Sequence, residues 1–156
     1  MTSLFAFLHH IAAFALVSAL AIEFVLIKGE LTMQRARQLQ LADLALGASA
    51  SALLVVGFLR VFYFEKGAPY YFHSVPFIAK VTLFVIVFLL SIYPTVEFLS
   101  WRKHVRQGRA PVIPERKLRS LRAVIHWELI AAALIILCAA LMARGVGYFG
   151  GGAVTS

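Results

Sequence analysis

Apolar residues along this chain are gathered into four long stretches, separated by shorter polar segments. The stretches cover residues 4–27, 40–59, 75–99 and 121–143. About 20 apolar residues in an α-helix cross the hydrocarbon core of a bilayer, so each stretch is long enough to span it. The pattern predicts an all-α membrane protein with a single domain, residues 1–156, built as a bundle of four transmembrane helices.

The composition also indicates a membrane protein. Hydrophobic residues make up 62% of the chain and charged residues only 14%, against roughly 25% charged residues in an average soluble domain. Cys138 is the only cysteine. A disulfide within the chain and a Cys-x-x-Cys zinc or redox site are therefore excluded.

Basic residues are concentrated in two of the three loops. The first loop carries Lys28, Arg35 and Arg37, and the third, residues 101–120, carries seven lysines and arginines. Because cytoplasmic loops are enriched in basic residues, we expect both loops in the cytoplasm and both termini on the periplasmic side of a bacterial inner membrane. The net charge of +8 arises mostly from these loops. It favours contact with anionic lipid head groups over a nucleic-acid partner.

With this topology, the ionisable residues at or near the apolar stretches fall into two layers. A charged side chain near the bilayer centre costs about 3 kcal/mol, so residues of this kind need partners or a function. The outer layer is basic and contains His9, His10, Arg60, His73, Lys80 and Arg144. The inner layer is mainly acidic and contains Glu23, Asp43, Glu97, His126 and Glu128.

Lys80 and the adjacent histidines are the strongest candidates for a site in the outer layer. Lys80 either reaches the interface along its apolar stem or faces inward as an amine that ligates a metal or acts as a base. His9 and His10 point about 100° apart on a helix, and the sequence does not decide which one faces the bundle. Imidazole is a common haem ligand, and facing helices of a bundle are a common place for it. This makes His10 a candidate haem ligand at nearly the depth of Lys80.

Other polar residues allow two interpretations each. Arg60 and Arg144 either anchor their helices at the outer interface or pair with the carboxylates of a bound porphyrin. His126 either makes a helix–helix hydrogen bond or serves a second cofactor or a proton relay. The carboxylates available to such a relay are Glu23, Asp43 and Glu97.

Small residues recur at helical spacing in the second stretch, at Gly47, Ser51 and Gly57. Small side chains let helix backbones approach closely in a membrane. We therefore expect this face of the second helix to pack against a neighbour.

Two segments resemble the HemJ family of membrane protoporphyrinogen oxidases. They are FLHHI at residues 7–11, and FIAKV at 77–81 followed by LLSIY at 89–93. The whole chain also resembles a bacterial family of uncharacterised four-helix membrane proteins. The HemJ resemblance implies a haem b within the bundle, with His10 and Lys80 at the positions of the family's helix-one histidine and helix-three lysine. It also implies porphyrinogen oxidation, with electrons passed to a quinone or the respiratory chain.

The leading hypothesis is therefore a haem-b-binding inner-membrane oxidoreductase with a quinone or respiratory partner, assembled as a homo-oligomer. His10 and Lys80 would ligate the iron, and the further cofactor-binding candidates are His9, Arg60 and Arg144. The alternative is a cofactor-free small transporter of protons or solutes, or an assembly subunit of a membrane complex. In that case the inner carboxylates and outer cations would line a path through the bundle.

Overall fold

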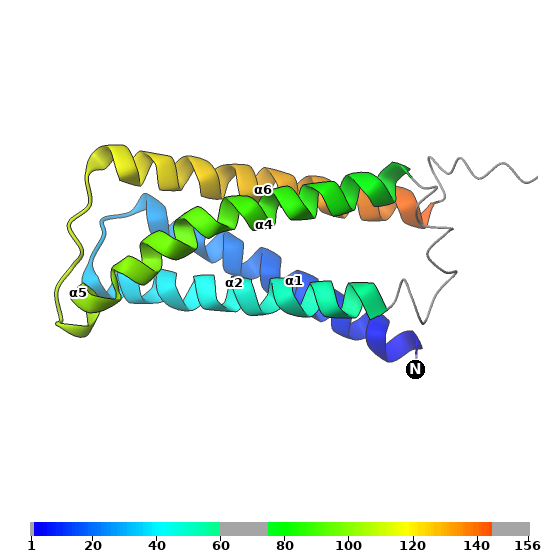
Figure 1. The fold of residues 1–156 in the computed structure, drawn as a ribbon, viewed down its shortest axis with the longest axis horizontal. Helices are drawn as coiled ribbons and strands as arrows, with labels where there is room; N and C mark the ends of the chain where they lie inside the picture. The colour runs from blue at the N-terminus through cyan, green and yellow to red at the C-terminus, as the bar shows by residue number, and fades with distance from the viewer. Residues whose placement is uncertain (1, 60–74, 145–156) are drawn as a thin grey trace, which may run out of the picture.

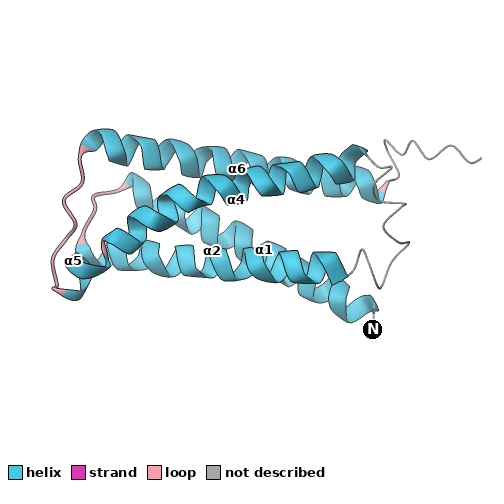
Figure 2. Cartoon of the chain, viewed as in Figure 1, coloured by secondary structure: helices cyan, strands magenta, loops and turns pink. Residues whose placement is uncertain are grey.

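The computed structural model describes residues 2–59 and 75–144, and the regular structure in these ranges is entirely helical (Figure 2). Four long helices carry the apolar stretches: α1 (Thr2–Lys28), α2 (Met33–Leu59), α4 (Val75–Ser100) and α6 (Glu115–Ala143). Each is long and apolar enough to cross a membrane, which confirms the predicted all-α membrane fold. A short helix, α5 (Arg102–Arg106), lies in the basic third loop.

Two helices begin earlier than the apolar pattern predicts. α2 begins at Met33 instead of residue 40, and α6 begins directly after Pro114 instead of at residue 121. The additional turns are amphipathic, so a purely apolar window misses them. The apolar side of these turns packs into the bundle: Ala36 and Leu39 of α2 are fully buried, and Leu118 of α6 packs against the core.

The four long helices form two antiparallel pairs, α1 with α2 and α4 with α6 (Figure 1). α1 also packs against α6, and α2 packs against α4. In the described part of the chain, the backbones of α1 and α4 do not approach each other closely, and neither do those of α2 and α6. These two combinations therefore lie across the diagonals of the bundle.

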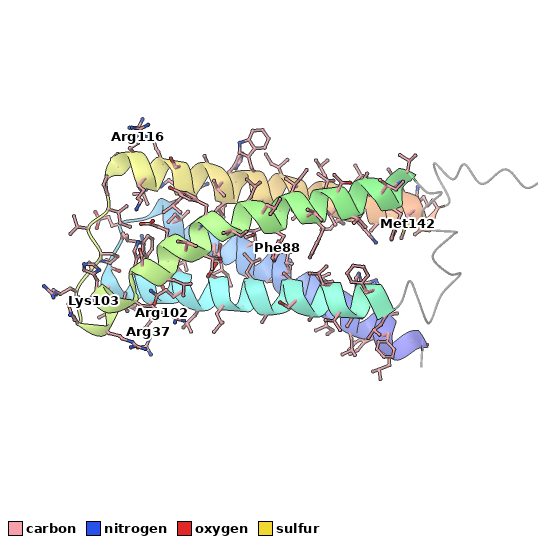
Figure 3. All side chains as sticks on the ribbon, in the orientation of Figure 1. Arg37, Phe88, Arg102, Lys103, Arg116 and Met142 are labelled. Carbon is pink, nitrogen blue, oxygen red and sulfur yellow. The ribbon has the colours of Figure 1, made fainter. Side chains whose placement is uncertain are left out.

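Both basic loops lie at one end of the bundle, which we call the loop end. Arg37, Arg102, Lys103 and Arg116 lie there, whereas Met142 lies at the opposite, far end (Figure 3). Two long helices, α2 and α4, separate the first loop from the third, so the chain crosses the bundle twice between them and returns to the same end. The distribution of basic residues that predicted their common side is therefore consistent with the fold.

The buried core is concentrated toward the loop end. Its largest fully buried apolar side chains are Leu20, Ile27, Leu39, Phe98, Leu121 and Ile125. Large apolar residues also cover the outside of the bundle, for example Phe14 at 77% and Leu44 at 64% exposure. An apolar exterior of this kind suits contact with lipid chains.

The expected close packing along α2 is correct at one glycine and wrong at another. A methyl group on Gly57 would lie 3.8 Å from Cε1 of His9, so α1 and α2 approach closely there. At Gly47 a methyl group would meet nothing within 4 Å. Gly47 therefore borders open space and not a neighbouring helix.

Candidate functional site

Three carboxyl side chains from three helices face the interior of the loop half of the bundle and lie near one another. They are Glu23 of α1, Asp43 of α2 and Glu128 of α6, and we call them the carboxyl cluster. Glu23 and Glu128 are fully buried and Asp43 is 8% exposed. Asp43 lies near enough to Glu23 and Glu128 to interact electrostatically with both.

Each carboxyl group occupies a position in the buried stripe of its own helix. Glu23 lies between the buried Leu20 and Ile27, at the three- and four-residue spacing that places side chains on one helical face. Glu128 follows the buried Leu121 and Ile125 at the same kind of spacing. The apolar residues that build the core therefore also turn these carboxyl groups inward.

α4 contributes two hydroxyl groups that contact the cluster. The Ser91 hydroxyl lies 2.8 Å from Oε1 of Glu128, and the Thr95 hydroxyl donates to Oδ1 of Asp43 at 2.6 Å. Ser91 and Thr95 are four residues apart and share one face of the helix. α4 thus connects a carboxyl group of α2 with a carboxyl group of α6.

The Ser91 hydroxyl has two acceptors within reach but only one proton to donate. Its oxygen also lies 2.9 Å from the carbonyl oxygen of Val87. When Ser91 donates to Val87, Glu128 can bond to Ser91 only as a protonated acid. When Ser91 donates to Glu128, the carboxyl group can be ionised. The site therefore accommodates Glu128 with or without its proton.

Glu23 has no hydrogen-bond partner among the residues that the structure describes, although both of its carboxyl oxygens are buried. Oε2 of Glu128 is buried without a partner as well. Leaving a neutral polar group unsatisfied costs about 1–3 kcal/mol, and an ionised one costs far more. We therefore expect Glu23 to carry a proton.

The structure separates the other two relay candidates from the cluster. Glu97 lies near the loop end, where its carboxylate is 2.8 Å from Nζ of Lys117 and accepts a hydrogen bond from Nε1 of Trp101. His126 is exposed and stacks on the ring of Phe24, with the ring centroids 5.7 Å apart. Of the predicted relay residues, only Glu23 and Asp43 therefore meet.

The cluster also contains residues that the sequence did not single out as a site. Glu128 lies about 200° around α6 from His126, so only one of the two can face inward, and it is Glu128. Ser91 and Thr95 are hydroxyl residues within an apolar helix. Their four-residue spacing was the available signal for a shared polar face.

The candidates of the outer layer do not converge in the same way. His10 is exposed, and its Nδ1 lies 2.6 Å from the carbonyl oxygen of Ala6 in its own helix. His9 is half-buried and faces Gly57 of α2.

Lys80 is half-buried, with Nζ 5.4 Å from the ring centroid of Phe77, also in its own helix. Arg144 is exposed at the end of α6; Arg60 and His73 lie outside the described residues.

A family comparison identifies the class of this membrane bundle. A family model described as a predicted membrane protein (DUF2214) matches residues 1–147. The chain belongs to the DUF2214 family. The match extends over all four long helices and agrees with the resemblance to an uncharacterised membrane family, whereas the HemJ resemblance is not part of it. No curated protein and no solved structure matches the chain.

The haem hypothesis for this DUF2214 protein can be compared with the geometry of its residues. Within the described ranges, no group of three or more His, Cys, Asp and Glu side chains is arranged to hold a metal ion. α1 and α4 are diagonal neighbours, which suits two ligands on opposite faces of a cofactor. However, the His10 ring lies on the exposed side of α1 and contacts its own backbone. This position does not fit a ligand of a haem inside the bundle, and His9 is the histidine that faces another helix.

Proposed function

We propose that this DUF2214 protein binds and releases protons at the carboxyl cluster as part of proton-coupled transport of a small solute. Glu23 carries the proposal, because it is fully buried in a membrane bundle with neither carboxyl oxygen hydrogen-bonded in the described structure. Ionisable residues inside membrane proteins are costly and commonly belong to ion paths or proton relays. Replacing a buried polar group by an apolar residue of similar size is often neutral or stabilising, so packing alone does not explain a carboxyl group at this position.

The surroundings of Glu23 support proton exchange within the cluster. Asp43 and Glu128 provide two further carboxyl groups on other helices, and each has a hydroxyl partner on α4. Ionising all three groups in one apolar interior would place like charges close together. The cluster is therefore suited to hold a variable number of protons. Ser91 can hydrogen-bond to Glu128 whether that carboxyl group is protonated or ionised.

A pH step applied to the protein in a solid-supported membrane tests this proposal. Protons that enter the bundle move charge across part of the membrane, so the wild type should give a transient current. Glu23→Gln keeps the size of the side chain and removes the titrating group, and it should reduce that current strongly. Glu115→Gln is the matched control, because Glu115 is an exposed carboxylate at the start of α6.

Three results would overturn the proposal. One is a wild-type current no larger than that of protein-free membranes. Another is an unchanged current in both Glu23→Gln and Glu128→Gln. A current lost equally in Glu115→Gln would also contradict it, because the signal would then come from the protein surface.

The oxidoreductase hypothesis, with haem b and a quinone or respiratory partner, stays a prediction. It is tested by oxidised and dithionite-reduced absorption spectra of protein purified from haem-replete cells. Stoichiometric b-type bands that disappear in His10→Ala or Lys80→Ala would establish the haem site. A colourless wild-type protein would contradict the haem hypothesis. If haem bands persist in His10→Ala, their loss in His9→Ala would identify the half-buried histidine as the ligand.

The orientation in the inner membrane is likewise a proposal, with the loop end in the cytoplasm. Val112 is 97% exposed in the third loop, so Val112→Cys in a Cys138→Ala background offers one accessible thiol. A membrane-impermeant maleimide should label it only after the cells are opened. Labelling of intact cells would reverse the topology. The predicted homo-oligomer is tested separately by the mass of the protein in native detergent complexes.

A further inference from the structure

A groove runs along the boundary between α2 and α4 and leads to one member of the carboxyl cluster. Its volume is about 360 Å³, within the range of sites that hold small organic ligands. Leu16 of α1 and the buried Leu46 and Val87 form its deeper part. Asp43 and Thr95 lie toward its loop end, and Phe84 and Phe88 lie farther along α4.

The groove opens toward the outside of the bundle. Phe88, Ile92 and Val96 line it and are themselves about half exposed, so their outer sides face the lipid region. Gly47 borders it from α2, where a side chain would meet open space. A molecule dissolved in the membrane could therefore enter between α2 and α4 without separating buried side chains.

Among the described residues, Asp43 is the only charged side chain that lines the groove. It is more than nine-tenths buried, and its only hydrogen bond in the described structure is the one that Thr95 donates to Oδ1. Oδ2 is left for another partner. An apolar groove that ends at a single carboxyl group is complementary to a small cation with an apolar body. The rings of Phe84 and Phe88 add a surface that attracts both cations and aromatic groups.

We propose that this groove binds a small amphipathic organic ammonium ion, whose charge pairs with Asp43. This inference rests on the proposed proton-binding function and names its substrate class. The carboxylic acid of Asp43 releases its proton to solvent as the ammonium ion arrives, so one positive charge replaces another and no other bond changes. A membrane lipid chain is the competing occupant, but it would leave the carboxyl group without a counter-charge.

Phenyltrimethylammonium and its uncharged isostere tert-butylbenzene provide a matched pair of probes. Calorimetric titration of the purified wild type in weak buffer should detect phenyltrimethylammonium binding with release of a proton, and tert-butylbenzene should not compete. Asp43→Asn should weaken binding by about tenfold or more, because a charge-assisted contact is lost. Gly47→Leu keeps the Asp43 carboxyl group and should fill the groove beside it, which should also weaken binding. Glu115→Gln should bind normally.

The outcomes separate this inference from the proton-binding function. If the pH-step current is intact but phenyltrimethylammonium does not bind, the groove inference fails alone. If tert-butylbenzene binds equally well and Asp43→Asn changes nothing, the groove is an apolar lipid site and the inference is overturned. If the ammonium ion binds through Asp43 but releases no proton, and the pH-step current is absent, the proton-binding function fails instead.

Discussion

The two halves of the bundle hold their ionisable side chains in opposite ways. In the loop half, the carboxyl groups of Glu23, Asp43 and Glu128 point inward and lie near one another. In the far half, His10 lies on the outside and Lys80 lies along its own helix. The fully buried ionisable groups among the described residues are therefore acidic, and the described basic groups are half-buried or exposed, although the sequence predicts a polar layer in both halves.

Side-chain length accounts for part of this difference. A lysine can keep its ammonium group near the interface while its stem stays in apolar surroundings. An aspartate or glutamate on the buried stripe of a helix is too short to do so. The position of a short carboxyl group on an inward face is therefore a stronger sign of an internal site than the position of a lysine at similar depth.

The largest expected effect concerns the packing that holds the loop half together. Phe98→Ala removes a fully buried ring that packs on Trp101 with the ring centroids 4.9 Å apart. We expect a loss of about 3 kcal/mol in the free energy of unfolding. Phe14→Ala makes the same change at a lipid-facing position and should cost much less. Equal losses in detergent unfolding titrations would show that the loop half is not the better packed one.

Arg122 tests whether polar contacts also join the two helix pairs at this end. Its guanidinium group donates to the carbonyl oxygens of Ile27 at 3.0 Å and Lys28 at 3.4 Å, at the end of α1. Arg122→Ala should lower the free energy of unfolding by about 1.5 kcal/mol, because these carbonyl groups lose a charged donor. Arg119→Ala, at an exposed position of the same helix, is the control. A control as destabilised as Arg122→Ala would mean that loop charge, and not this contact, is responsible.

The Ser91 hydroxyl of α4 tests whether its hydrogen bond to Glu128 stabilises the loop half. Ser91→Ala deprives Glu128 of its only hydrogen bond in the described structure and should lower stability by about 1 kcal/mol. Ser51→Ala removes a hydroxyl that bonds only within its own helix, to Gly47, and should change stability little. The same two proteins can be compared in the unfolding titration. A neutral Ser91→Ala would argue against a structured contact between α4 and the cluster.

The smallest effect is expected at the edge of the loop half. Glu97→Gln breaks an ion pair whose lysine is about half exposed, so we expect only a small loss in the free energy of unfolding, and a smaller one at high salt. Glu115→Gln serves as the control with a still more exposed carboxylate. A large, salt-independent loss would place Glu97 with the buried carboxyl groups and weaken the distinction between the two environments.

The membrane-spanning elements could be predicted because they depend on local hydropathy. Helix length and the number of apolar residues locate the four spans, and the basic loops identify which ends lie together. The amphipathic turns at Met33 and Glu115 were missed because they contain too many polar residues for an apolar window. Depth along each helix was therefore available from the sequence, while the full helix lengths were not.

The membership of the site could be predicted only in part, because it depends on how each helix is rotated. Depth places Glu23 and Asp43 in the inner layer, but it does not distinguish Glu128 from His126 on the same helix. The buried positions of Leu121 and Ile125 fix the rotation of α6 and bring Glu128 inward. Packing between helices decides such rotations, and it is not visible in one apolar stretch taken alone.

The central claim, that Glu23 holds an exchangeable proton inside the bundle, is tested most directly by infrared difference spectroscopy of the protein in lipid. The wild type should show the carbonyl stretch of a protonated carboxylic acid in an apolar environment, shifted by exchange into deuterated water. The Glu23 component of this band should be lost in Glu23→Gln and kept in Glu115→Gln. A wild type without a protonated-carboxyl band, or a band that survives in Glu23→Gln unchanged, would contradict the account.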